Sequence, residues 1–143
     1  MNPSSDMPQE DDLTYEEVTH NIRVAVAPSF MEDQSEPAEG RFIWSYRVTI
    51  ENRRAETVQL VARHWRITDA HGRVREVRGP GVVGEQPTIA PGNVFEYTSG
   101  APLETPSGVM TGSYRMRANS GESFEVSIPL FALDSPYDIR QIH

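Results

Sequence analysis

The 143-residue chain contains no cysteine, no lysine and no long hydrophobic run. The missing cysteines exclude disulfides, thiolate metal ligands and cysteine nucleophiles. The missing lysines exclude Schiff-base chemistry and the lysine of P-loop nucleotide sites. No apolar run approaches the roughly 18 residues that a membrane-spanning helix needs, and the first residues lack the basic and apolar regions of a secretory signal. We therefore expect a soluble, bacterial-type cytoplasmic protein without membrane insertion.

The formal net charge of −8 is unevenly distributed along the chain. Residues 1–40 contain ten acidic residues and one arginine, whereas residues 41–143 contain eleven acidic residues and twelve arginines. Nucleic-acid-binding domains usually carry a basic surface, so this balance argues against a nucleic acid partner. Residues 1–14 combine acidic residues, prolines and serines, which predicts a disordered acidic leader before one domain over residues 15–143.

Alternation of apolar and polar residues predicts strands throughout this domain. The clearest case is residues 42–51, where Phe42, Trp44, Tyr46 and alternate residues after them share one face. We expect a first strand from Val18 to about residue 28, then a mobile acidic loop at residues 32–40. A third strand starts near Val58 and changes phase before Trp65, which predicts a β-bulge near residues 63–64.

Turn signals divide the rest of the chain into short strands. Residues 69–72 read as a hairpin turn, and residues 79–87 and 100–108 read as loops. Between these loops, Phe95 and Tyr97 indicate a short strand, and two alternating segments follow between residues 110 and 130. The tail retains Leu133, Tyr137, Ile139 and Ile142, which we expect to dock on the body. This spacing predicts an all-β, immunoglobulin-like or fibronectin type III β-sandwich of seven or eight antiparallel strands, with a barrel as the alternative.

Residues 79–87, here called the glycine loop, contain the sequence motif G-x-G-x-x-G at Gly79, Gly81 and Gly84. A dinucleotide-binding fold is excluded, because no helix follows the glycines and Glu85 would repel a phosphate. One interpretation is an anion nest of backbone amides flanked by arginines. The other is a tight crossover between sheets that needs glycine for its backbone angles. The candidate anion contacts are Arg73, Arg75 and Arg78.

The remaining reactive side chains show no recognisable catalytic or metal-binding spacing. The four histidines are His20, His64, His71 and His143. They form no close pair, and we expect His64 to be a half-buried residue at a sheet edge. The acidic loop could supply oxygen ligands for magnesium, but it lacks EF-hand spacing, so a solvated loop is the favoured interpretation. No G-x-S-x-G motif is present. We expect no metal site, no cofactor beyond a weakly bound Mg²⁺, and no enzymatic activity.

Six segments occur in the order found in the ApaG family, which the chain resembles over residues 16–143. They are residues 64–69, 79–87, 89–92, 97–100, 105–116 and 128–131. The resemblance implies a fibronectin type III sandwich, an association with cobalt resistance and magnesium efflux, and similarity to an interaction module of eukaryotic F-box proteins and a DNA polymerase-delta-interacting protein. It also implies a phosphate site at the glycine loop.

Two functions are therefore expected for residues 15–143, and a hydrolase is the least favoured third. The first is a non-enzymatic binding domain in divalent-cation homeostasis that contacts a protein partner through the glycine loop and the following loop at residues 98–108. The second is a binder of polyphosphate or nucleotide, with or without magnesium, at the glycine loop. An exposed edge strand leaves both monomer and dimer open. The candidate binding residues are Gly79, Gly81, Gly84, Glu85, Thr98 and Ser99.

Overall fold

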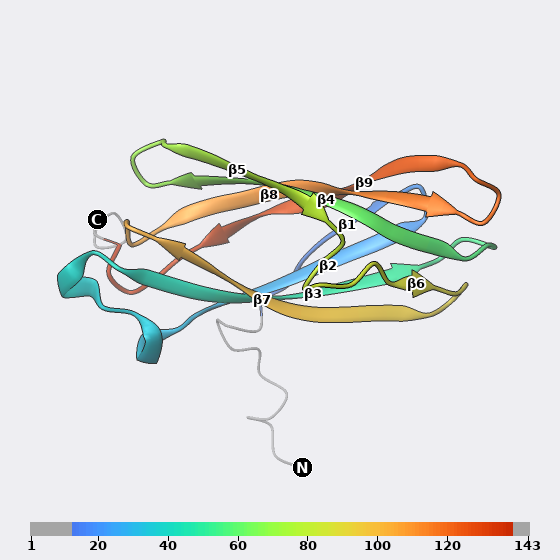
Figure 1. Ribbon diagram of the computed structural model, residues 1–143. Coiled ribbons are helices and arrows are strands. Elements are labelled where there is room, and N and C mark those ends of the chain that lie inside the picture. The colour runs from blue at the N-terminus through green and yellow to red at the C-terminus, as the bar shows by residue number, and fades with distance from the viewer. Residues whose placement is uncertain (1–12, 139–143) are drawn as a thin grey trace, which may run out of the picture.

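The computed structural model describes residues 13–138, which form two antiparallel sheets packed face to face (Figure 1). One sheet has the strand order β1-β2-β3-β7, and the other has the order β5-β4-β8-β9 with β6 paired to β4. The strands are β1 (Tyr15–Thr19), β2 (Ile22–Phe30), β3 (Phe42–Asn52), β4 (Val58–Asp69), β5 (Val74–Pro80), β6 (Thr88–Ile89), β7 (Val94–Leu103), β8 (Gly108–Ala118) and β9 (Ser123–Leu133). The described residues contain no helix long and apolar enough to cross a membrane.

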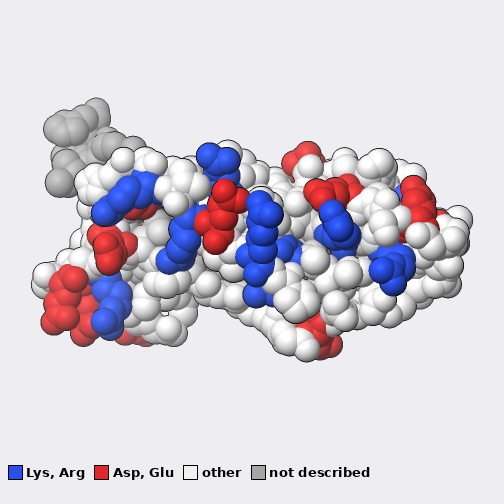
Figure 2. Space-filling model, turned by 45° about the horizontal axis from the view of Figure 1, so that its top comes forward, with Lys and Arg blue, Asp and Glu red and all other residues white. Residues whose placement is uncertain are grey.

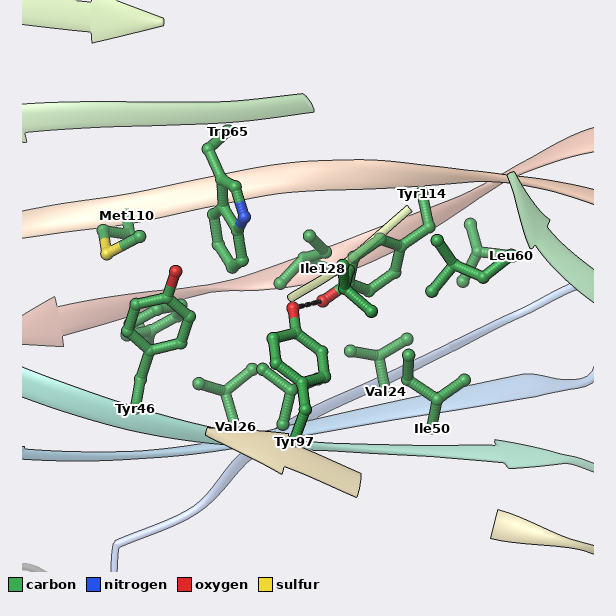
Figure 3. Packing of buried hydrophobic residues seen from close by; sticks show 14 of the residues in the cluster. Val24, Val26, Tyr46, Ile50, Leu60, Trp65, Tyr97, Met110, Tyr114 and Ile128 are labelled. Carbon is green, nitrogen blue, oxygen red and sulfur yellow. Dashed lines mark hydrogen bonds between the residues drawn. The ribbon is translucent and has the colours of Figure 1, made fainter. Parts of the chain in front are cut away.

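The hydrophobic core fills the space between the two sheets (Figure 3). Every second residue of β3, from Phe42 to Ile50, is buried, as the alternating pattern predicts. From the opposite sheet, Leu60, Trp65 and Tyr114 project toward them. The expected all-β, immunoglobulin-like sandwich is therefore confirmed, and its core is a single cluster.

The predicted first strand is instead a hairpin. Strands β1 and β2 pair antiparallel, with Thr19 opposite Ile22. His20 and Asn21 between them have φ values of 51° and 63°, the positive angles of a two-residue type I′ turn. The described residues thus form nine strands rather than seven or eight, because this hairpin and the short β6 each add one.

Strand β4 contains one extra residue relative to its neighbour β8. Leu60 lies opposite Met116 and Ala62 lies opposite Arg115, so Val61 has no partner in the register. The predicted bulge is confirmed, but it lies two residues earlier than expected. Before it Val58 and Leu60 are buried, and after it Trp65 and Ile67 are. The odd-numbered residues face the interior after the bulge because one added residue reverses the alternation.

Strand β7 is much longer than predicted. It runs from Val94 to Leu103 and pairs with β3 along its whole length. The expectation of a loop over residues 100–108 was wrong, since only residues 104–107 separate β7 from β8. Gly100 and Pro102 suggested a loop, but both are compatible with a strand at the edge of a sheet, where one side of the backbone has no partner.

The acidic loop and the tail lie together at one end of the sandwich. Residues 32–40, predicted to be a mobile acidic loop, contain two short 3₁₀ turns, η3 (Glu32–Gln34) and η4 (Pro37–Glu39). The ring of Tyr137 packs beside Phe30 and Phe42, and its hydroxyl donates to Glu32 at 2.5 Å. The predicted docking of the tail is confirmed for Leu133 and Tyr137, whereas Ile139 and Ile142 lie outside the described residues. The predicted leader also lies outside them, apart from Leu13 and Thr14.

The two long sides of the sandwich differ. Along one side β1 and β9 close the gap between the sheets, because the Thr19 hydroxyl accepts a hydrogen bond from the Ser127 N–H at 3.2 Å and the rings of Tyr15 and Phe131 lie 6.1 Å apart. Along the other side the edge strands are β5 and β7, which belong to different sheets and are not paired with each other. The glycine loop leads from the first of these edges toward the second (Figure 1).

Two glycine-to-alanine variants test the close approach of the central strands. An added Cβ at Gly112 in β8 would lie 2.1 Å from the carbonyl oxygen of His64, whereas at Gly100 it would lie 3.5 Å from that of Trp44. We predict that Gly112→Ala lowers the free energy of unfolding by about 3 kcal/mol, because backbone must move to admit the methyl group. Gly100→Ala should change it by less than about 1 kcal/mol. Urea denaturation of both variants measures this, and equal losses would contradict it.

Candidate functional site

The glycine loop is a tight crossover built on left-handed backbone conformations. Val82 and Glu85 each donate a backbone hydrogen bond to the carbonyl of the other at 2.8 Å. Between them Val83 and Gly84 have φ values of 42° and 80°, as in a type I′ turn. Gly81 has a φ of 56°, and an added Cβ there would lie only 1.9 Å from the carbonyl oxygen of Glu85. Glycine is required at residue 81 both for its backbone angle and for space.

This geometry uses three of the backbone amides that an anion nest would need. The N–H of Gly81 donates to Val61 at 2.8 Å, and those of Val82 and Glu85 donate to each other's carbonyl oxygens. An amide that already donates a hydrogen bond within the protein has little left to offer an anion. These three amides are therefore not available to an anion, and the side chains around the loop are the remaining strong donors.

An open pocket of about 300 Å³ lies beside the glycine loop, between the two sheets; we call it the interlayer pocket. Its polar lining residues are Tyr46, Arg63, Arg75, Tyr97 and Ser99. Its remaining lining residues are Trp65, Ile67, Val77, Val82, Val83, Gly84, Gly100, Ala101 and Met110. The lining thus comes from both sheets and the glycine loop, on the side where β5 and β7 form the edges. An aromatic and aliphatic wall with a few convergent polar groups is typical of a binding site.

Two guanidinium groups give the pocket a positive charge. Arg63 donates from Nη1 to the carbonyl oxygens of Pro80 and Gly81, both at 3.0 Å, and its guanidinium packs against Gly79. Arg75 is exposed and lines the same pocket from β5. Neither arginine belongs to any of the ion pairs formed within residues 13–138. These charges are therefore available to an anionic group of a ligand.

Three tyrosines place hydroxyl groups inside the sandwich near Arg63. The Tyr97 and Tyr114 hydroxyls lie 2.5 Å apart and form a buried hydrogen bond (Figure 3). Burial is the main cause that raises the pKa of Tyr46, Tyr97 and Tyr114 above the ordinary value, and the charge of Arg63 opposes that rise. All three hydroxyls therefore remain protonated at neutral pH and act as neutral hydrogen-bonding groups.

The structure brings together only some of the predicted binding residues. Gly84, Ser99 and Arg75 line the interlayer pocket. Gly81 shapes the turn that borders it, and Gly79 lies beneath the guanidinium of Arg63. These five residues converge because the end of β5, the glycine loop and the middle of β7 meet at the open side of the sandwich.

The other predicted binding residues do not line the interlayer pocket. Thr98 and Ser99 belong to strand β7 rather than to a loop, and alternation directs Thr98 away from the pocket that Ser99 lines. Arg78 pairs with Glu76 at 3.2 Å, and Arg73 pairs with Asp69 at 2.9 Å. The Glu85 side chain is exposed at the loop. Alternation along a strand separates Thr98 from Ser99 and Arg78 from Arg75, whereas Arg73 lines a neighbouring hollow together with Arg75.

The most informative residue that sequence reasoning missed is Arg63. The predicted phase change contained the signal, because Trp65 and Ile67 face inward and Arg63 lies two and four residues before them on the same strand face. Placing the bulge at Arg63 itself hid this position. Tyr46 and Tyr97 carried a second signal, since a buried tyrosine hydroxyl requires a hydrogen-bond partner and so indicates polar groups in the interior.

The opposite, outer face of the β5-β4-β8-β9 sheet carries arginines interspersed with acidic side chains (Figure 2). His64 is half-buried as expected, but it lies on an interior strand, since β4 is flanked by β5 and β8. Its Nε2 is 2.6 Å from a Glu76 carboxylate oxygen, and this contact is the main cause that lowers the pKa of Glu76. Arg117 on this face has no ion-pair partner among the described residues.

Within residues 13–138 no three histidine, aspartate or glutamate side chains converge so as to hold a metal ion.

A second hollow, of about 560 Å³, adjoins the interlayer pocket toward the 3₁₀ turns. The two hollows share Ile67 and Arg75, and the second continues between β5 and β7 to Leu103 and Glu104. Together they form a groove along the open side of the sandwich, which we call the edge groove. Arg75 lies at its centre.

A double-mutant cycle tests the buried tyrosine pair. Tyr114→Phe or Tyr97→Phe leaves one buried hydroxyl without its partner, and each is predicted to cost about 1–3 kcal/mol of unfolding free energy. The double variant removes both polar groups, so its cost should be smaller than the sum of the single costs by about 1 kcal/mol. Chemical denaturation of the four proteins measures this coupling. Strict additivity would show that the hydroxyls do not stabilise each other.

Comparisons with known proteins identify the family. A protein named ApaG from Rhodospirillum centenum is 64% identical over 123 residues, which are 86% of this chain and 95% of that protein. ApaG from Parvibaculum lavamentivorans is 57% identical over 129 residues, which are 90% of this chain and 99% of that protein. The crystal structure of a Bordetella pertussis protein named ApaA has a TM-score of 0.80 at 45% identity, covering 84% of this chain and 98% of that one. Since the family model of the ApaG domain also matches residues 32–118, the chain belongs to the ApaG domain family.

Proposed function

We propose that this chain is a non-enzymatic binding domain that receives an anionic group of a protein partner in the interlayer pocket. The observation that supports this is the pair Arg63 and Arg75, which both line the pocket and have no carboxylate partner among the described residues. Their surroundings combine apolar walls with neutral hydroxyl groups. A partner that presents a carboxylate together with apolar side chains complements this lining.

The titratable groups of the pocket favour binding over turnover. They are two arginines and two tyrosines, and burial keeps the pKa of Tyr46 and Tyr97 above the ordinary value. General-base catalysis needs a group whose pKa lies near the working pH. Arginine and these tyrosines are protonated there, so they can donate hydrogen bonds and hold charge but have little capacity to accept a proton.

The proposed biological setting is divalent-cation homeostasis. It rests on the resemblance to the ApaG family, which is associated with cobalt resistance and magnesium efflux. We propose that the domain acts on this process through its protein partner, so that the cation itself is handled elsewhere. This proposal requires of the domain only a surface that recognises the partner.

Affinity capture with charge-reversed variants tests the proposal. Arg75→Glu reverses the charge inside the pocket, whereas Arg117→Glu makes the same change at an exposed, unpaired arginine on the opposite outer face. We predict that crosslinked capture from cell extract enriches a protein with the native chain and with Arg117→Glu, and that Arg75→Glu lowers its yield about tenfold. If the two variants capture the same proteins in the same yield, the interlayer pocket is not the partner site.

A second candidate function is the binding of a free phosphate compound. The specific observation in its favour is that two unpaired guanidinium groups and the Ser99 hydroxyl line one pocket, a combination suited to phosphate oxygens. If this function holds, pyrophosphate or ATP, with or without magnesium, should shift the amide resonances of Gly84 and Ser99 in the native protein. The shifts should be lost in Arg75→Glu and kept in Arg117→Glu. Unchanged spectra at millimolar ligand would exclude it.

A further inference from the structure

The edge groove is bordered by two strands that each lack a neighbour on one side. Strand β7 ends the first sheet, and β5 ends the second, and the described residues include no strand that pairs with the outer edge of β7. The far side of the sandwich differs, since β1 and β9 contact each other there. A free strand edge presents unpaired N–H and C=O groups, which can pair with an extended segment of another chain.

Backbone alternation shows which groups of β7 are free. In the adjacent strand β3, the carbonyl of Ile43 accepts from the Met31 N–H at 2.8 Å, and the Ile43 N–H donates to the Ser35 hydroxyl at 2.9 Å. The backbone groups of Ile43 therefore point away from β7. Because successive residues of an antiparallel strand point their backbone groups in opposite directions, those of Trp44 point toward β7.

The pairing of β3 with β7 shows which residues of β7 direct their backbone groups toward β3. Trp44 lies opposite Ala101, so Ala101 bonds to β3, and Ser99 does the same two residues earlier. The intervening residues Thr98 and Gly100 direct their N–H and C=O groups to the free edge. Both are exposed, and the small residues on either side of Gly100 leave room for another backbone to approach.

Strand β7 is a better template than β5. It has ten residues to the seven of β5, and its middle part, residues 98–101, is uncharged. Strand β5 has charged side chains at Arg75, Glu76 and Arg78, which discourage edge pairing, whereas proline does not separate the two strands, since β5 ends at Pro80 and β7 contains Pro102 next to its last residue. A segment paired with β7 would lie over the edge groove, where its alternate side chains face Arg63 and Arg75.

We propose that an extended, acidic peptide segment of the partner adds to the free edge of β7, and that one of its carboxylates lies between Arg63 and Arg75. This inference rests on the proposed protein-binding function and adds the form of the partner. Main-chain pairing at Thr98 and Gly100 would supply the register, and the two guanidinium groups would select an acidic side chain over a basic one. The adjoining hollow extends the groove beyond the pocket, as a segment of several residues requires.

A synthetic peptide tests this directly on the full chain. The probe is the N-acetylated, C-amidated pentapeptide Val-Glu-Val-Glu-Val, in which the acidic side chains share one face. Binding should slow hydrogen exchange of the Thr98 and Gly100 amides about tenfold or more, because they gain hydrogen bonds. The same sequence with lysine in place of glutamate should give no protection, and neither should the acidic peptide with alternate backbone nitrogens methylated.

Protein variants separate the two contributions. Thr98→Pro removes the edge N–H without breaking the ladder to β3, and should weaken binding about tenfold, whereas Thr98→Ala keeps the N–H and should bind like the native chain. Arg75→Glu should abolish binding and Arg117→Glu should not. If Thr98→Pro does not fold, the methylated peptide makes the same test with the native protein.

The outcomes distinguish this inference from the function on which it rests. Equal binding of the lysine peptide, or binding without amide protection in β7, would overturn strand addition. Arg75-dependent capture of a protein without such protection would also overturn it while leaving the binding function standing. Protection by the acidic peptide that is lost with the methylated peptide and with Arg75→Glu would support strand addition, whether or not capture from cell extract enriches a protein.

Discussion

The extra residue in β4 is the constraint on which the site depends. With Val61 inserted, Arg63, Trp65 and Ile67 face the interior in place of their neighbours. The same residue anchors the glycine loop, because its carbonyl accepts hydrogen bonds from the Gly81 N–H at 2.8 Å and from the Gln86 side chain at 2.9 Å. One irregularity thus brings a guanidinium between the sheets and also fixes the loop beside it. Without it, alternation would direct Ala62 and His64 inward, and the polar wall of the pocket would not form.

The glycine loop is held by packing as well as by hydrogen bonds. Val82 is 1% exposed and belongs to the core cluster, and complete burial of a valine side chain contributes roughly 1.5–3 kcal/mol. The loop therefore closes part of the opening between β5 and β7, while Val83 at its tip remains exposed. What stays open is the interlayer pocket. Its position follows from the difference between the two sides of the sandwich, one closed by β1 and β9 and the other only partly closed by a loop.

The sequence predicts the parts of this fold that local patterns determine. Strand β3 alternates without interruption, and the turn at residues 69–72 has glycine at a φ of 83°, so both could be read directly. The hairpin at His20 and Asn21 was missed because neither residue is glycine and the apolar alternation continues through the turn. The length of β7 was missed because Gly100 and Pro102 are common in loops, and only pairing with β3 keeps them extended. For the site, Ser99 and Arg75 were found but Arg63 was not, since its direction depends on where the bulge lies to within one residue.

The arrangement around Arg63 has an energetic cost that a purely structural core would avoid. A guanidinium and three tyrosine hydroxyls occupy space between the sheets where aliphatic side chains would pack without any need for hydrogen-bond partners. The structure compensates for part of this cost, because Arg63 donates to two carbonyl oxygens and Tyr97 pairs with Tyr114. Arg75 receives no such compensation from the described residues, yet it is exposed and costs little when free. A polar cluster between the sheets next to an uncompensated cation at an open edge is the pattern expected where recognition, rather than stability, sets the choice of side chains. The sandwich supplies rigidity, and under the proposed function the selectivity of the domain would depend on the few residues that the bulge, the glycine loop and the β7 edge bring together.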